Sequence, residues 1–564
     1  MALAPNSRHI KSLLSPPERL HTLQVDSVQR WMEDLRHMTE VECMCILQSK
    51  PISVEEEAGA GELIVGGERA ARDGLQMLLR RAFAVSAELG KVFHRLEKGR
   101  WSRVHSTAVR VHSHMRSLVH EYSSVRGSLP EMQKYEKSLL DKCLELTTIT
   151  ERCVHTEDEF LLRSMKEATQ EILTDISDSF SQMIDMALAN EIQILIRQIE
   201  TSDNVYTIGG AISSLLSLTQ DGPQLCSIIA KEGAVVALFK ICRQDCFSCL
   251  YAHALRTVAS ICCVEEGINQ LEKPIVVAYL CNRTIWKKRH LEESAEVWDL
   301  SGLPQVDGIL CLADILTDES NAEAARAEAA AVVAQITSPH HTFTQHLGSF
   351  LENMQDIVTA LIKLCRDASS GESFLLASAA LANITFFDTM ACEILLQLGA
   401  IHILFGACRD RHRVDTPYSK DQVATILANL SVLEQSASEV LQENGIERLL
   451  LLLAEKPSSS SPSEGAACER VQQKAAVTLA RLSRDPEVAQ TAIQLQAIPH
   501  LIELCRSPAE RNSSDSVLVA CLAALRRLVA VCPDSIEDAD HQQLIKPRLV
   551  DSFLLCSNME ESFV

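Results

Sequence analysis

The feature that most constrains the fold of this chain is an internal repeat in its second half. Three segments superpose on a small residue, an Ile just behind it and a Leu-rich stretch: residues 395–410, 441–455 and 493–507, with Gly399, Gly445 and Ala497, and an earlier copy surrounds Gly233. A second apolar element alternates with them, in which Asn383, Asn429, Arg481 and Arg527 hold the same place at steps of 46, 52 and 46 residues. Such a period is typical of stacked helical repeats.

One repeat of two or three short helices cannot bury its apolar faces, but neighbouring copies can cover them. Aromatic residues make up only 4% of the chain, and Leu, Ala, Ile and Val supply the apolar surface, which suits packed helices. We therefore expect an all-α solenoid over residues 206–547. Interruptions of the period predict loop insertions around residues 273–301 and at residues 456–465.

The repeat cores resemble the armadillo family of β-catenin and importin-α. They place Gly before an Ala- or Ile-led, Leu-rich helix and carry Leu-Ala-Asn-Leu or Leu-Ala-Asn-Ile in the next element. In that family an Asn on the last helix of each repeat binds the backbone of an extended peptide in a groove, and Asn383 and Asn429 match this position. The positions that depart from it are Ser260, Gln335, Arg481 and Arg527. The resemblance therefore implies groove binding around the two central repeats at most, and heat-type repeats remain an alternative.

The region before the repeats, residues 68–205, reads as helices almost throughout and predicts a helical bundle. We expect its breaks near Gly99, between Gly127 and Pro130, and near His155. A basic, His-rich stretch lies at residues 103–120. A solvated helix face explains this stretch better than a metal or phosphate site, because its His residues are not paired with carboxylates at ligand spacing.

The N-terminal region combines flexible and amphipathic sequence. Residues 1–22 lack periodicity and predict disorder, whereas residues 26–48 carry one apolar stripe of a helix, followed by an acidic, Gly-rich stretch. A lone helix of this length is marginal in water, so it either folds back onto the following domain or folds on a partner. We favour the second alternative for residues 23–67. The candidate binding residues are Val28, Trp31, Met32, Leu35, Met38, Val41, Ile46, Glu55, Glu56 and Glu57.

The last four residues are Glu561, Ser562, Phe563 and Val564, within a tail at residues 548–564. Ser at the antepenultimate place and a terminal Val form a class I PDZ ligand, which adds as a strand to the edge of the domain's sheet. The alternative is an ordinary terminus without a partner. We favour the PDZ ligand, because the sequence after Pro547 predicts a loosely tethered tail.

Charge and motifs exclude several function classes. A net charge of −22 argues against nucleic acid or anionic lipid as the main partner. The 20 Cys lack paired zinc-finger spacing, and the cluster Cys242, Cys246 and Cys249 has no fourth ligand at a familiar spacing, so we expect reduced, mostly buried thiols. The sequence has no P-loop, GxSxG or HExxH motif, no run of 18 apolar residues and no secretory signal. We expect no enzyme, no cofactor and no membrane span.

Taken together, the peptide VDSVQRWMEDLRHMTEVECMCILQ, the repeat cores and the ending ESFV resemble the Inscuteable family of adaptors in asymmetric cell division. The resemblance implies that Trp31, Leu35 and Met38 bind the tetratricopeptide groove of a Pins-type (LGN) protein, with the acidic segment against basic groove residues. It also implies that the repeats and tail contact a Bazooka-type Par scaffold linked to atypical protein kinase C. The cytoplasmic protein would then act at the apical cell cortex, where it directs spindle orientation. The alternative is a catenin- or importin-like receptor for an extended cargo peptide.

Overall fold

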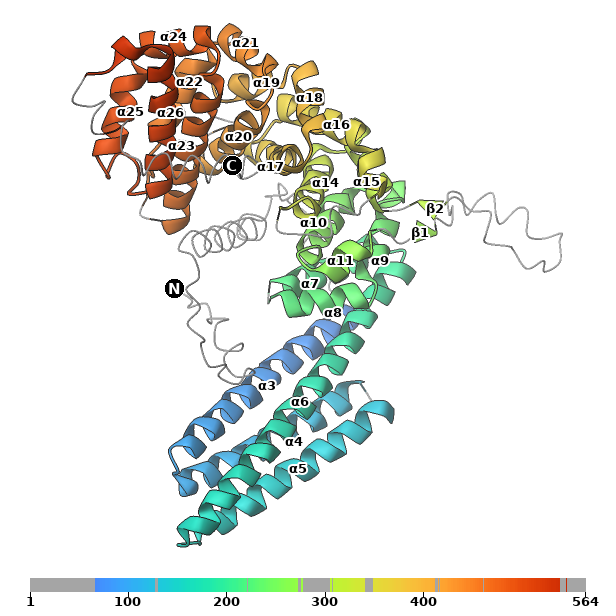
Figure 1. Cartoon of the computed structure of the whole chain (residues 1–564). Helices are drawn as coiled ribbons and strands as arrows, with labels where there is room; N and C mark the ends of the chain where they lie inside the picture. Colours follow the sequence, from blue (N-terminus) through green and yellow to red (C-terminus); the bar gives the residue numbers. More distant parts are fainter. Residues whose placement is uncertain are drawn as a thin grey trace, which may run out of the picture. The chain divides into compact units, whose positions relative to one another are not determined.

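The structure is a computed structural model that describes residues 66–126, 130–220, 222–271, 275–276, 305–306, 308–339, 348–410, 414, 416–459, 461–537 and 544 (Figure 1). Its helices divide into two compact units, with the boundary between Leu215 and Leu216. The expected all-α architecture is confirmed, apart from one pair of two-residue strands.

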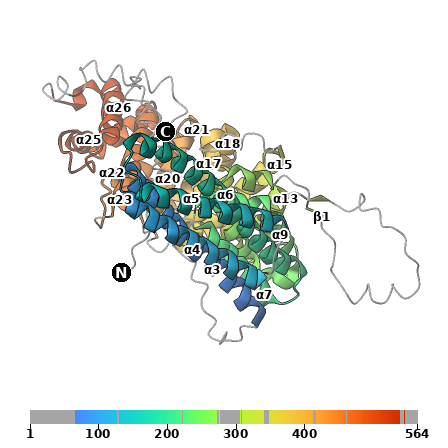
Figure 2. The ribbon, with the colours of Figure 1, turned by 90° about the horizontal axis from the view of Figure 1, so that it is seen from below.

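The first unit is a bundle of four long helices, α3 (Gly66–Glu97), α4 (Trp101–Arg126), α5 (Pro130–Val154) and α6 (Glu159–Thr201). Short connections make consecutive helices antiparallel, and α6 packs against both α5 and α3, which closes the bundle (Figures 1 and 2). Apolar side chains at steps of three and four form its core. Fully buried examples are Val85, Val92, Val111, Leu139, Leu146, Leu173 and Ile176.

The breaks between these helices lie where the sequence predicts them, and local chemistry accounts for two of them. Gly99 follows α3 with a φ of +63°, a left-handed conformation that Gly adopts at low cost. Asp158 caps α6, because its Oδ1 accepts hydrogen bonds from the backbone N of Phe160 at 2.9 Å and of Leu161 at 3.3 Å. The turn between α5 and α6 is thereby fixed next to His155.

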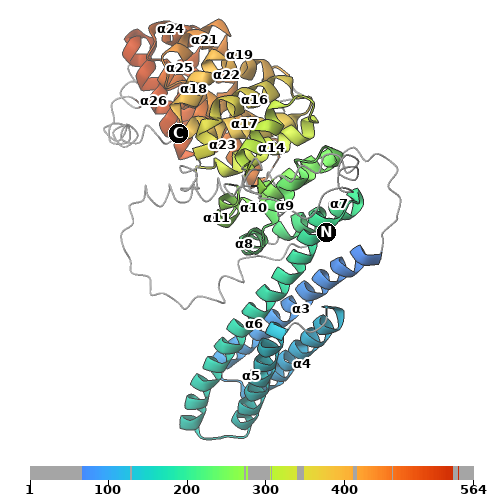
Figure 3. The same ribbon diagram turned by 90° about the vertical axis from the view of Figure 1, so that its right-hand side faces the viewer.

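The second unit is a solenoid in which one helix of each repeat stacks in a central row, labelled in Figure 1 and seen from another side in Figure 3. The row consists of α10 (Tyr251–Ile261), α14 (Glu323–Ile336), α17 (Gly371–Phe387), α20 (Pro417–Leu430), α23 (Pro462–Leu482) and α26 (Asp515–Val531). Each member packs against the members before and after it, and buried Ala, Leu, Ile and Val side chains fill the interfaces. Stacking therefore buries faces that a single repeat would leave in water.

The other helices of this unit pack beside the row or beside one another. They are α8 (Pro223–Lys231), α9 (Ala234–Ile241), η1 (Asp245–Leu250), α11 (Glu265–Asn269), α13 (Gly308–Thr317), α15 (Gly348–Glu352), α16 (Met354–Asp367), α18 (Thr389–Gln397), α19 (Ala400–Ala407), α21 (Gln435–Gln442), α22 (Gly445–Leu453), α24 (Pro486–Gln494), α25 (Ala497–Arg506) and η4 (Pro533–Ser535). The helix α7 (Val205–Thr219) contains the boundary between the two units. Among the described residues, no single helix has the length and apolar character of a membrane span. The pair α18 and α19 passes that test only jointly and is bent by 79°.

The structure corrects the expected equivalence of Gly399, Gly445 and Ala497. The left-handed residue before the Leu-rich helix is Gly399 in one repeat, with φ +68°, but Asn444 in the next, with φ +52°. Gly445 is instead the first helical residue, like Ala497. It must be small because a Cβ there would lie 2.5 Å from Cε2 of Phe405 in the preceding repeat. Two requirements, a left-handed turn and a close helix approach, thus fall on adjacent positions.

The insertion expected around residues 273–301 begins and ends at an antiparallel strand pair. β1 (Ile275–Val276) pairs with β2 (Gln305–Val306), with Ile275 opposite Val306. Just beyond the pair, the backbone N of Gly308 donates a 2.8 Å hydrogen bond to the carbonyl O of Leu271. The ends of the insertion are therefore held together, and α13 resumes the solenoid directly after it.

Candidate functional site

A ladder of polar side chains joins successive helices of the central row. Asn383 Nδ2 donates to Ala334 O at 2.8 Å, Asn429 Nδ2 donates to Ala382 O at 3.3 Å, and Arg481 Nη1 donates to Ala428 O at 2.8 Å. In each case the acceptor lies one residue before the corresponding position of the preceding helix. Side chains at one repeat position therefore tie the four consecutive helices α14, α17, α20 and α23 together.

This ladder occupies the two Asn residues that were predicted to face a groove ligand. Asn383 is half-buried, and Asn429 is buried with 8% of its surface exposed. Asn429 also donates to Thr385 Oγ1 at 3.0 Å, so both of its amide N–H groups have partners. Both residues lie on the central row as expected. Peptide binding by either one stays a prediction.

The sequence pattern missed Arg481 as a ladder residue, because it departs from the Asn found at the equivalent sites. The chemistry explains the exchange. Ala334 and Ala428 lie within the last four residues of their helices, where carbonyl groups lack an intrahelical partner. Any side chain that brings an N–H donor to that carbonyl can satisfy it. The residue type at this position can therefore differ between repeats as long as the side chain carries a donor.

A buried carboxylate joins α20 to α23. Asp421 Oδ2 accepts from Arg470 Nε at 2.7 Å, and its Oδ1 pairs with Lys474 Nζ at 2.9 Å. Burial favours the neutral acid, but Arg470 and Lys474 together outweigh it and hold the pKa of Asp421 below its ordinary value. One negative charge thus faces two cations in a buried site.

A second buried cluster, between α10, α14 and α17, has two carboxylates for one cation. Arg256 Nη2 lies 2.8 Å from Glu328 Oε1 and 3.5 Å from Glu372 Oε1, so two carboxylates share one cation. Burial of Glu328 raises its pKa to about 7, with Arg256 opposing the shift and Glu372 adding to it. Glu328 therefore takes up a proton close to neutral pH.

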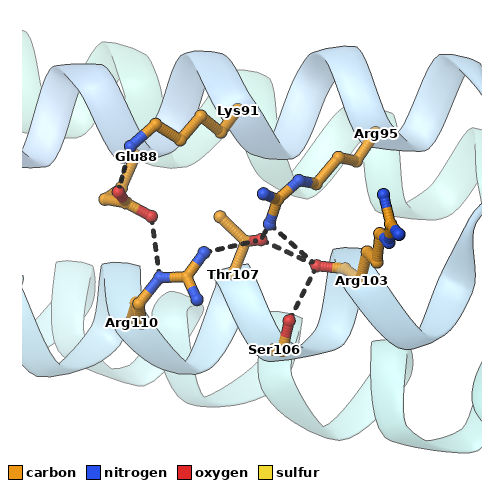
Figure 4. Close-up of polar contacts among 7 residues, drawn as sticks. All are labelled: Glu88, Lys91, Arg95, Arg103, Ser106, Thr107 and Arg110. Carbon is orange, nitrogen blue, oxygen red and sulfur yellow. Dashed lines mark hydrogen bonds and ion pairs between the residues drawn. The ribbon is translucent and has the colours of Figure 1, made fainter.

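The bundle carries a basic ridge, defined here as Lys91 and Arg95 on α3 with Arg103 and Arg110 on α4 (Figure 4). Glu88 is the acidic residue in this cluster: Lys91 Nζ donates to it at 2.6 Å and Arg110 Nε at 3.0 Å. Burial opposes ionisation of Glu88, but these two cations lower its pKa, so it stays charged. Four cations against one carboxylate leave the ridge positive.

A buried hydroxyl sets the geometry of the ridge. Thr107 Oγ1 donates to the carbonyl O of Arg103 at 2.7 Å and accepts from Arg110 Nη2 at 3.3 Å and from Arg95 Nη1 (Figure 4). Two guanidinium groups are thereby drawn to one point between α3 and α4. The side chain of Arg103 itself is exposed. The ridge can therefore present positive charge to an acidic chain.

The end of the bundle beside the ridge carries exposed apolar side chains. This bundle tip is defined here by Val154, Phe160 and Leu161, whose exposed fractions are 38%, 85% and 47%. An open pocket of about 640 Å³ lies there, lined by Thr148, Glu151, Arg152, His155, Thr156, Leu161 and Met165. Lys166 Nζ donates to Glu97 O at 3.5 Å, which joins the start of α6 to the end of α3. The tip and the ridge thus share one end of the bundle.

Three features singled out in the sequence remain: the Cys cluster, in which no metal site is expected, and the two linear segments at the ends of the chain. Among the residues that the structure describes, no group of three or more His, Cys, Asp and Glu side chains is placed to hold a metal ion. Cys242 is buried, whereas Cys246 and Cys249 are exposed. The N-terminal binding residues from Val28 to Glu57 and the tail residues Glu561 to Val564 lie outside the described residues.

Two protein-family models match the chain. The model described as "Inscuteable LGN-binding domain" matches residues 23–70, and the model described as "Protein inscuteable C-terminal" matches residues 81–297 and 283–564. "Protein inscuteable homolog" of Homo sapiens and of Mus musculus are each 60% identical to the chain over 565 residues. Each alignment covers 100% of this chain and 92% of the relative.

Solved structures with similar coordinates include repeat proteins. A designed armadillo repeat protein aligns at 17% identity with a TM-score of 0.35, over 50% of this chain and 99% of that chain. An engineered protein aligns at 17% identity with a TM-score of 0.44, over 87% of this chain and 98% of that chain.

Proposed function

The chain belongs to the Inscuteable family, and from this premise we propose that it is an adaptor that binds an LGN-type spindle-orientation protein through its N-terminal segment. The observation that carries the proposal is the match of residues 23–70 to the family model named for LGN binding. These residues include the apolar stripe with Trp31, Leu35 and Met38 and the acidic run Glu55–Glu57. An apolar helical stripe and an adjoining acidic run suit a groove with apolar pockets and basic residues.

The test is a binding measurement between the full chain and the tetratricopeptide repeats of an LGN-type protein. Trp31→Ala and Met38→Ala should each weaken binding by about 1–3 kcal/mol, the range for anchor residues at an interface. Tyr206→Ala is the matched control, because Tyr206 is an exposed aromatic on α7. Unchanged affinity in both N-terminal variants would refute the assignment.

We extend the proposal to a second partner, a Bazooka-type Par scaffold with atypical protein kinase C. The support is the sequence ending Glu561-Ser562-Phe563-Val564, which fits a class I PDZ ligand. Deleting Val564 should abolish binding to the PDZ domains and leave LGN-type binding intact. PDZ binding that survives the deletion contradicts this part. The adaptor would then join the polarity complex at the apical cortex to the spindle machinery, without catalysis of its own.

A further inference from the structure

The ridge and the tip of the bundle form a surface that is complementary to one segment outside the described residues: the ridge has the opposite charge, and the tip is apolar like part of that segment. The ridge is cationic through Lys91, Arg95, Arg103 and Arg110, and the tip exposes Val154, Phe160 and Leu161. Residues 26–48 carry an apolar helical stripe, and Glu55–Glu57 follow it. The apolar stripe suits the tip, and the three carboxylates suit the ridge.

We infer that residues 26–57 fold back onto this surface when no partner is bound, with Glu55–Glu57 along the ridge and the apolar stripe on the tip. This inference rests on the proposed function, because the same segment is the proposed ligand of the LGN-type protein. The bundle would then act as an internal competitor for the peptide.

Chain length permits this register. The helix α3 starts at Gly66, and Lys91 lies 25 residues further on, roughly 37 Å along the axis at 1.5 Å per residue. Glu55 precedes Gly66 by 11 residues, which span up to about 37 Å when extended. The backbone of Glu55 can therefore come level with Lys91, and the long side chains of Glu55, Arg95 and Arg103 have to bridge the remaining distance to the far end of the ridge. The apolar stripe, which precedes the acidic run in sequence, then falls at the tip.

Tethering makes even a weak contact matter. The connection from Glu55 to Gly66 reaches Lys91 only when nearly extended, so the effective concentration of the segment lies below the millimolar range of a slack flexible linker. A contact whose dissociation constant equals that effective concentration is populated about half of the time. The apparent affinity for the partner falls by the fraction of chains in which the peptide is free. We expect variants that release the fold-back to bind the partner about two- to tenfold more tightly. The fraction of chains that are folded back in the wild type sets the upper limit of this gain in affinity.

The experiment measures amide hydrogen exchange of residues 26–57 in the full chain without any partner. The first variant is Phe160→Ala with Leu161→Ala, and the second is Arg103→Glu; all three side chains are exposed, so the bundle core is untouched. Both variants should speed exchange in residues 26–57 compared with the wild type. High salt should speed exchange in the wild type more than in Arg103→Glu, because the ridge contact is screened.

Matched controls lie away from this end of the bundle. Tyr206→Ala removes an exposed aromatic on α7, and Lys137→Glu reverses an exposed charge near the start of α5, at the opposite end of the bundle. Neither should alter exchange in residues 26–57. Equal exchange in the wild type and in both test variants overturns the inference. Variants that change only self-association, measured by light scattering, assign the tip to a second copy of the chain and also overturn it.

A second readout separates this inference from the proposed function. Affinity of the full chain for the LGN-type repeats should rise in both test variants and stay constant in both controls. If the full chain shows no binding at all, the proposed function fails, while the exchange measurement still decides whether the segment folds back. Faster exchange with unchanged affinity would show a contact that does not compete with the partner, which contradicts the inferred competition.

Discussion

Arg481 Nη1 donates a 2.8 Å hydrogen bond to the carbonyl O of Ala428, one residue before Asn429. Asn429 makes the corresponding bond one repeat earlier, to Ala382. A guanidinium and an amide thus serve the same position of the solenoid, because both present an N–H donor to the preceding helix. The ladder gives these polar residues a structural role that is independent of any ligand in a groove.

Asn429→Ala should loosen the contact between α17 and α20. The change removes two hydrogen bonds from a buried amide and leaves Ala382 O and Thr385 Oγ1 without that donor, at a cost of about 1–3 kcal/mol. Hydrogen exchange of α20 measures this local free energy of opening. Asn383→Ala is the comparison: it loses one bond at a half-buried site that water can reach, so the loss there should be smaller.

The same pair of variants distinguishes the adaptor from a cargo receptor. If Asn383 and Asn429 bind an extended peptide, the double Ala variant loses cargo captured by the solenoid but keeps binding to an LGN-type protein. The adaptor proposal expects both kinds of binding to persist, with only the local stability reduced. Loss of cargo capture without a change in hydrogen exchange of α17 and α20 would favour the receptor alternative.

Asp421→Asn should destabilise the packing of α20 on α23. The variant leaves Arg470 and Lys474 beside a neutral amide in a buried site, which costs about 3–5 kcal/mol when one partner of a buried pair is removed. Asp515→Asn is the control, because Asp515 is exposed and lies 3.9 Å from Arg511. Hydrogen exchange of α23 measures the effect, and equal values for the two variants would contradict the role of the cluster.

The Asp421 pair also has a pH signature. The pKa of Asp421 is lowered in the folded chain, so its stabilisation is present above the unfolded value of 3.8. It is lost as the pH falls through the lowered folded pKa. The difference in local stability between the wild type and Asp421→Asn should therefore shrink only below about pH 4, where the carboxylate of the unfolded chain begins to protonate while that of the folded chain is still charged.

Glu328 has the opposite pH signature. Its pKa is about 7 in the folded chain against 4.5 when unfolded, so the folded state holds a proton that the unfolded state has released. The contribution of Glu328 to stability therefore falls as the pH rises from 4.5 to 7, by about 3 kcal/mol. Glu328→Gln removes this pH dependence, so the stability of the variant relative to the wild type should rise between pH 4.5 and 7. Hydrogen exchange of α14 at several pH values measures the difference.

Glu372→Gln is the check on this cause. It removes the second carboxylate near Arg256, which lowers the pKa of Glu328 and shifts the pH-dependent region downward. An unchanged pH profile in Glu372→Gln would mean that Glu372 does not act on Glu328.

Gly445→Ala should disturb the interface between two repeats. The added Cβ would meet Cε2 of Phe405 at 2.5 Å and Cγ1 of Val440 at 2.7 Å, and overpacking of this kind costs about 1–3 kcal/mol. Gly406→Ala is the matched control within α19, because no atom lies within 4 Å of its added Cβ. There the higher helix propensity of Ala should leave the stability of the chain unchanged or raise it. Thermal unfolding of both variants separates the two outcomes.

The periodic sequence was sufficient to predict the central row, the bundle and its three breaks. A Leu-Ala-x-Leu core recurs in α20 and α23, and α17 has Leu-Ala-Asn-Ile at the same place. A helix period of 3.6 decides which face is buried. It was insufficient for the register of Gly399 and Gly445, because both are Gly and both stand just before or at the start of a Leu-rich helix. Only the contact with Phe405 distinguishes the close approach from the left-handed turn.

Local pattern alone thus determined the fold class and the positions of the helices, because these depend on neighbours in sequence. The linear segments at residues 26–57 and 561–564 stay predictions of the same kind. The tertiary structure decided what the polar residues on the central row do. Whether Asn429 faces a ligand or Ala382, and whether Glu328 or Asp421 carries its charge, depends on partners about 45 to 70 residues away. Burial and charge at those sites arise only when the repeats stack, and no spacing within a single repeat encodes them.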